Sequence, residues 1–117
     1  MLESWFNTAG TTIAAVERSA DAQARVDAAT AHMALYHYES CMFCARVRRA
    51  IATLKLNIEL RDVLREPGHR NDLVAGGGST TVPCLRIDED GRTNWMYESA
   101  DIIAYLNGRF GAGTAQA

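Results

Sequence analysis

The chain has 117 residues, of which 48% are hydrophobic and 22% charged, values typical of a single globular domain. Twelve basic and fourteen acidic side chains give a net charge of −2, which offers no electrostatic basis for binding nucleic acid. No apolar run approaches the roughly 20 residues that span a bilayer, and the first 20 residues lack the pattern of a secretory signal. The odd number of cysteines, three, favours a reducing cytoplasmic location over a disulfide framework.

Residues 1–30 form an extension that precedes the predicted domain. The part that begins at Ser19 is rich in helix-forming residues, with Ser19 as the expected N-cap and Asp21 in the first turn. Apolar residues upstream suggest a loose amphipathic face: Leu2, Trp5, Phe6, Ile13 and Val16. We expect this face to pack on the domain or to fray. Weak peripheral membrane contact through residues 1–18 is the minority interpretation, because the polar side lacks the basic residues of such helices.

From Met33 onward, strand-like and helix-like patterns alternate. A strand is predicted over 34–38, a helix over 41–56 and a second strand over 58–63. Pro67 begins a short helix that glycines 76–78 end, and a third strand follows over 81–87. A turn at 88–91 leads to a fourth strand over 94–97, and Ser99 is expected to cap a last helix. The three arginines of the first helix are interpreted as a solvated face: Arg46, Arg48 and Arg49.

The order β-α-β-α-β-β-α predicts an α/β domain over residues 31–110. Its simplest form is a mixed four-stranded sheet with helices on both faces. A right-handed crossover makes the first two strands parallel, and the last two are close enough to form an antiparallel hairpin. Residues 111–117 are expected to be a disordered tail.

Cys41 and Cys44 form a CxxC pair where the first strand gives way to a helix. At a helix N-terminus, unpaired N–H groups and the helix dipole favour thiolate over thiol. Cys44 lies one turn deeper, so Cys41 is the predicted nucleophile and Cys44 the resolving thiol. A metal half-site is the alternative, and its further ligands would come from a small set: Cys84, His32, His37 and His69. We favour redox chemistry without a metal, because a CxxC pair beside a βαβ pattern is its usual context.

Two further segments place polar groups near the ends of predicted elements. In Thr81-Val82-Pro83, a cis Val82–Pro83 bond would turn the Val82 backbone groups outward to pair with an extended peptide. The alternative is a trans proline in an edge strand. At the last helix, the Ser99 hydroxyl suits a carboxylate and Asp101 suits an ammonium, the two charges of a γ-glutamyl group. The alternative there is an ordinary helix cap.

Residues 33–110 resemble a glutaredoxin of the thioredoxin superfamily, and thus imply a thioredoxin fold. The CxxC pair, the Thr-Val-Pro segment at 81–83 and Glu-Ser-x-x-Ile at 98–102 stand in the order of that family. The whole chain is similar to small bacterial glutaredoxin-like proteins. The Tyr-Glu-Ser segment at 97–99 also resembles the N-terminal domain of glutathione transferases.

The resemblance implies a role for individual residues. Cys41 would form a mixed disulfide with glutathione, the co-substrate, and Cys44 would resolve it. The implied glutathione-binding residues are Val82 and Pro83 at the cysteine backbone, Arg70 at the glycine carboxylate, and Ser99, Asp101 and Glu98 at the γ-glutamyl end. The partners would be disulfide-containing proteins or glutathione mixed disulfides.

Some positions depart from the glutaredoxin pattern. Met42 stands where many glutaredoxins have proline, and Tyr38 stands where many have a lysine that would place a cation near the thiolate. Tyr97 and Glu98 replace a Gly-Gly pair. Cys84 is most simply a buried strand cysteine.

We therefore expect a glutathione-disulfide oxidoreductase, and two alternatives stay open. The transferase-like segment at 98–99 suits transfer of glutathione to small electrophiles, although transferases usually add a helical C-terminal domain and this sequence stops at Ala117. Monothiol glutaredoxins hold a glutathione-ligated iron–sulfur cluster between two subunits through the residue that corresponds to Cys41. The presence of Cys44 disfavours that function.

Overall fold

The computed structural model describes residues 16–111 of the chain. Most of the predicted amphipathic N-terminal face, and residues 112–117 of the predicted tail, lie outside the described residues. Within 16–111, no helix is both long enough and apolar enough to cross a membrane.

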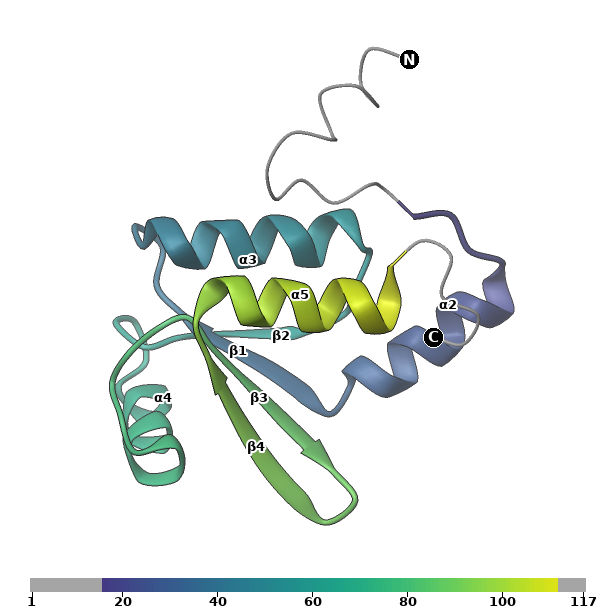
Figure 1. The fold of residues 1–117 in the computed structure, drawn as a ribbon. Coiled ribbons are helices and arrows are strands. Elements are labelled where there is room, and N and C mark those ends of the chain that lie inside the picture. Colours follow the sequence, from purple (N-terminus) through teal and green to yellow (C-terminus); the bar gives the residue numbers. More distant parts are fainter. Residues whose placement is uncertain (1–15, 112–117) are drawn as a thin grey trace.

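A mixed four-stranded sheet forms the centre of the molecule (Figure 1). Its strands are β1 (Met33–His37), β2 (Glu59–Asp62), β3 (Cys84–Glu89) and β4 (Arg92–Tyr97), in the order β2-β1-β3-β4. β1 pairs in parallel with β2 and antiparallel with β3, which pairs antiparallel with β4. The predicted α/β thioredoxin-like topology is confirmed, including the parallel first pair and the hairpin.

Helices cover both faces of this sheet, as predicted. α3 (Met42–Thr53) and α5 (Ser99–Phe110) lie over one face, and α2 (Ala20–Thr30) packs at their far ends (Figure 1). The larger apolar core fills this side and includes Leu35, Val47, Ile51, Leu85, Ile102, Leu106 and Phe110. α4 (Pro67–Asp72) and the π-helical turn η1 (Leu73–Gly77) cover the other face, over a smaller core of Ala34, Tyr36, Val63, Leu73 and Cys84. Because both faces are covered, every residue of the central strand β1 is buried.

Val16 and Val26 connect the N-terminal extension to the main core. Both side chains are buried within the larger cluster, with 3% and 0% of their surface exposed. Ser19 caps α2 as predicted, because its side-chain oxygen accepts a hydrogen bond from the Ala22 N–H at 3.1 Å. The described part of the extension is therefore packed against the sheet domain.

Proline and glycine set the limits of two elements. The third strand begins at Cys84 rather than at residue 81, because Pro83 has no N–H for a strand ladder. The short helix continues as η1 and ends at glycines 76–78, as predicted: Gly78, at φ 83°, adopts the left-handed conformation that glycine favours. Close packing requires the preceding glycine as well, since a side chain at Gly77 would clash with Tyr97.

The start of the last helix also differs from the prediction. Ser99 is the first helical residue of α5, and Glu98 occupies the N-cap position without a side-chain capping bond. The predicted role of Ser99 as a helix cap was therefore wrong. Its hydroxyl is left for other partners at the helix N-terminus.

Candidate functional site

Three chain segments converge along one edge of the sheet, namely the edge at which β1 and β4 end and β3 begins. The strand register places Tyr36 of β1 opposite Cys84 of β3, and Cys84 opposite Tyr97 of β4. The end of β1, the start of β3 and the end of β4 thus lie in one row. The CxxC, Thr-Val-Pro and Glu-Ser segments are the continuations of these strand ends. Figure 1 shows the N-termini of α3 and α5 at the same edge, so the fold gathers the three predicted motifs there.

Cys41 is the N-cap residue of α3. Its Sγ accepts a hydrogen bond from the Cys44 N–H at 3.2 Å, and its own N–H donates to the Tyr38 carbonyl at 3.2 Å. The sulfur therefore lies against the positive end of the helix dipole. Only 9% of the residue is exposed, so a reactant must fit closely to reach it.

Cys44 lies beneath Cys41 and is fully buried. Burial, together with the hydrogen bond to the Cys41 sulfur, raises the pKa of the Cys44 thiol to about 12. It is therefore a neutral thiol at physiological pH, as a resolving cysteine is before the first step. Both cysteines are unpaired thiols in the structure.

We expect iodoacetamide to add once to the native chain at pH 7.5 and three times after unfolding in denaturant. Cys41 is buried but keeps 9% of its surface exposed at a helix N-terminus, whereas Cys44 and Cys84 are fully buried neutral thiols. Intact mass and peptide mapping would locate the single adduct. The Cys41→Ser variant should carry no adduct in its native state, and rapid native labelling of Cys44 or Cys84 would contradict this assignment.

Cys84 lies on the other face of the sheet from the CxxC pair. It belongs to the smaller core, and burial raises the pKa of its thiol to about 11. Burial beside this thiol also raises the pKa of Tyr97 to about 12, so both groups are neutral. The interpretation of Cys84 as a buried strand cysteine is confirmed.

The Val82–Pro83 peptide bond is cis, as predicted. Val82 precedes β3 and forms no backbone-to-backbone hydrogen bond within residues 16–111. Its N–H and C=O are therefore available to an extended ligand at the edge that also carries Cys41.

Glu98, Ser99 and Asp101 lie around the N-terminus of α5. Glu98 has φ 74° and ψ 111°, a conformation that costs energy for a residue with a side chain. This backbone turns the chain from β4 into the helix. Ser99 is half-buried and Asp101 exposed, and none of the three side chains forms a hydrogen bond with a described residue. A ligand would meet them, and the open N–H groups of the first turn, without displacing internal bonds.

Arg70 is the one predicted site residue that the register does not bring to this row. It is exposed on α4, which packs on the opposite face from α3, and its guanidinium contacts no described acceptor. Its assignment to a glycine carboxylate stays a prediction.

The sequence interpretation did not foresee the contact between His37 and Arg48. Arg48, predicted to be solvated, is half-buried and donates to the His37 Nδ1 at 2.9 Å. Desolvation of the buried His37, reinforced by the positive Arg48, lowers the pKa of the imidazole, so it is neutral and able to accept this bond. One sequence signal was present: Arg48 lies one helical turn beyond Cys44, on the side of α3 that returns toward β1.

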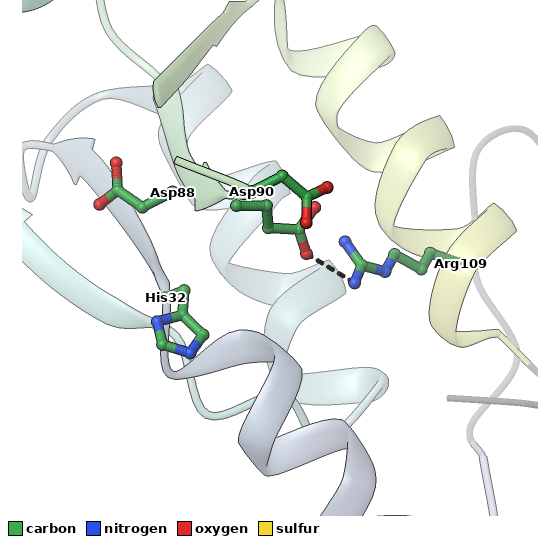
Figure 2. Close-up of a pocket in the computed structure, with 5 residues that line it drawn as sticks. His32, Asp88, Asp90 and Arg109 are labelled. Carbon is green, nitrogen blue, oxygen red and sulfur yellow. Dashed lines mark ion pairs between the residues drawn. The ribbon is translucent and has the colours of Figure 1, made fainter. Parts of the chain in front are cut away.

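A separate hollow of about 480 Å³ lies at the opposite end of the molecule (Figure 2). It is lined by His32, Asp88, Glu89, Asp90 and Arg109. Glu89 and Arg109 form an ion pair at 2.7 Å across it. The hollow contains no thiol, and no group of three or more His, Cys, Asp or Glu side chains within residues 16–111 is arranged to hold a metal ion.

Solved structures similar to this chain are mainly glutathione transferases. Maleylacetoacetate isomerase from Anaeromyxobacter dehalogenans, solved with glutathione in its active site, shares 30% identity at a TM-score of 0.52. The match covers 67% of this chain and 37% of the isomerase, so the chain spans little more than a third of that relative. A glutathione transferase from Drosophila melanogaster matches at 23% identity and a TM-score of 0.53, over 68% of this chain and 35% of its own. No curated protein matches the sequence.

A small thioredoxin-like protein supports the fold assignment. It shares 23% identity at a TM-score of 0.52, over 64% of this chain and 99% of its own. The thioredoxin-like fold is thus confirmed, but the similar structures are transferases rather than glutaredoxins specifically. The sequence pattern described as "Glutathione S-transferase, N-terminal domain" matches residues 35–114. The chain therefore belongs to the glutathione S-transferase N-terminal domain family.

Proposed function

We propose that this chain binds glutathione in the manner of a glutathione transferase N-terminal domain, with Cys41 as the reacting thiol. The main support is the strand register, which gathers the CxxC, Thr-Val-Pro and Glu-Ser segments at one edge. The family match and the glutathione held by the isomerase relative support the same ligand.

The polar groups at this edge match the parts of glutathione. Ser99 and the N-terminus of α5 suit the γ-glutamyl carboxylate, and Asp101, supported by Glu98, suits its ammonium. The Val82 backbone, held before Pro83, would pair with the cysteine residue of the tripeptide. Arg70 is the candidate partner of the glycine carboxylate.

The proposed reaction is thiol–disulfide exchange. The Cys41 thiolate attacks the glutathione sulfur of a mixed disulfide, forming a Cys41–glutathione disulfide and releasing the substrate thiolate, which takes up a proton. The thiolate of a second glutathione then attacks the glutathione sulfur of the Cys41 adduct. This attack restores the Cys41 thiolate and forms glutathione disulfide, which leaves. For a protein disulfide, Cys41 first forms a mixed disulfide with the protein. The Cys44 thiol, once it has lost its proton, then attacks the Cys41 sulfur, forming a Cys41–Cys44 disulfide and releasing the second protein thiolate. Two glutathione molecules reduce this disulfide in two successive exchanges and leave as glutathione disulfide. No metal takes part.

A second candidate function, which the family match and the similar structures favour over a glutaredoxin reaction, is addition of glutathione to small electrophiles. The similarity to a maleylacetoacetate isomerase favours it, since another structure of that enzyme holds dicarboxyethyl glutathione and citrate in its active site. Conjugation of chlorodinitrobenzene and reduction of hydroxyethyl disulfide, measured side by side, would rank the two reactions. Activity with the disulfide that exceeds conjugation, and that requires Cys41, supports the exchange reaction.

We expect Ser99→Ala to weaken glutathione binding about tenfold or more. The hydroxyl donates to a charged carboxylate in the proposed complex, and such a bond contributes about 1.5–3 kcal/mol. Isothermal titration calorimetry with reduced glutathione would measure the change in Kd. Asn107→Ala, at an exposed position near the other end of α5, is the matched control and should leave the Kd unchanged. Equal affinities for wild type and Ser99→Ala would refute the proposed orientation.

A further inference from the structure

A single guanidinium group spans the loop that joins β1 to the CxxC helix. Arg48 donates from Nη1 to the His37 Nδ1 at 2.9 Å and to the Tyr38 carbonyl at 3.3 Å. From Nη2 it donates to the Glu39 carbonyl at 3.1 Å. Three consecutive residues before the active-site turn are therefore bound by one side chain of α3.

The same loop fixes the position of Cys41. The Tyr38 carbonyl that accepts from Arg48 also accepts the Cys41 N–H at 3.2 Å. Only two residues separate Tyr38 from Cys41, so a shift of the Tyr38 carbonyl would move the N-cap residue and its sulfur. Arg48 also lies close enough to the CxxC pair for its charge to favour the thiolate of Cys44.

We infer that Arg48 is a positioning residue for the Cys41 thiol, and that His37 makes this positioning depend on pH. The inference rests on the proposed function, in which Cys41 is the reacting group. A lysine at this position would keep the charge but could not form the forked contact with three acceptors.

His37 is the titratable element of this contact. An arginine can only donate, so the His37 Nδ1 must carry its lone pair to accept from Arg48. Protonation would remove that acceptor and place two cations together. Glu39 in the loop and Asp62 at the end of β2 favour the protonated ring, whereas burial and Arg48 oppose it more strongly. The contact is thus intact at neutral pH and is lost on acidification below the ordinary range of histidine.

The test is the rate of Cys41 alkylation by iodoacetamide, measured on the folded chain. We expect Arg48→Lys to lower the rate constant at pH 7.5 about tenfold, because charge alone does not restore the loop. Arg49→Met, an exposed position on the same helix, changes the net charge without touching the loop and should leave the rate unchanged. A wild-type rate in Arg48→Lys would overturn the positioning role.

The pH dependence requires a second variant, His37→Gln, which keeps an acceptor oxygen but cannot be protonated. We expect the alkylation rate of the wild type to fall more steeply between pH 7 and pH 5 than that of His37→Gln, because only the wild type loses the acceptor for Arg48 on acidification. Identical profiles in the two proteins would overturn the role of His37. Alkylation needs no glutathione, so failure of glutathione binding would leave this result interpretable by itself.

Discussion

Replacing Cys41 with serine is expected to abolish glutathione-dependent disulfide reduction, with a loss of at least about a thousandfold in kcat/KM. A serine hydroxyl is scarcely ionised at neutral pH, even against the N–H groups that stabilise the sulfur at the start of α3. Serine also forms no stable covalent intermediate equivalent to a disulfide. The measurement is NADPH consumption in an assay coupled to glutathione reductase, with hydroxyethyl disulfide as substrate.

Two controls separate the chemical role of Cys41 from folding and from binding. Cys84→Ala removes a thiol on the opposite face of the sheet and should keep near-normal activity in the fraction that remains folded. Cys44→Ser should retain the exchange with glutathione mixed disulfides, because a second glutathione can resolve the Cys41 adduct. Calorimetry on Cys41→Ser should still show glutathione binding. Disulfide reduction at the wild-type rate in Cys41→Ser would refute the nucleophile assignment.

The order of strands and helices could be predicted from sequence because each element carries a local periodic signal. The buried stripe of α3, for example, has its apolar residues at helical spacing: Val47, Ala50 and Ile51. Two of the boundaries that differed, the starts of β3 and α5, each depend on a single residue. Pro83 lacks the donor that would start β3 earlier, and Glu98 adopts a positive φ that no local pattern foretells.

The members of the candidate site could be predicted, but not the reason that they meet. The sequence identifies a thiol pair, a proline segment and a serine at a helix start, separated by up to 60 positions along the chain. Their convergence follows from the antiparallel register of β3 with both neighbours, which joins Tyr36, Cys84 and Tyr97 in one row. Strand order of this kind is a tertiary property.

Arg48 illustrates a different limit of sequence interpretation. Helical periodicity separates apolar from polar faces, so an arginine is assigned to solvent by default. In the structure, Arg48 is half-buried and its guanidinium reaches three acceptors, one on the last residue of β1 and two in the loop that follows. Backbone carbonyls leave no trace in the pattern of side chains, so this role is visible only in coordinates.

Three short motifs are also not enough to distinguish a glutaredoxin from a glutathione transferase. The CxxC and Thr-Val-Pro segments resemble glutaredoxins, whereas the Tyr-Glu-Ser segment resembles transferases. The family match to the transferase domain extends over residues 35–114 and so includes the segments between the motifs. The Tyr-Glu-Ser segment at 97–99 was the local sequence feature that indicated similarity to transferases.

Arg18 joins the N-terminal extension to the far ends of two helices. Its guanidinium donates to the Leu54 carbonyl at 2.8 Å, to the Phe110 carbonyl at 2.7 Å and to the Gln23 Oε1 at 2.9 Å. Leu54 is the C-cap of α3, and Phe110 is the last residue of α5. Carbonyls at helix ends lack partners within the helix and carry the negative end of the dipole, so one cation stabilises both helices.

We therefore expect Arg18→Met to lower the free energy of unfolding by about 2–4 kcal/mol, because it leaves two half-buried carbonyls without their charged donor. Urea denaturation followed by circular dichroism would measure the change. Arg25→Met, at an exposed position of α2, alters the net charge equally and should cost less than about 0.5 kcal/mol. Equal losses in the two variants would show that charge, rather than the bridge between helix ends, sets the stability. Because Arg18 lies at the ends of α3 and α5 opposite to Cys41, the alkylation rate of folded Arg18→Met should match the wild type.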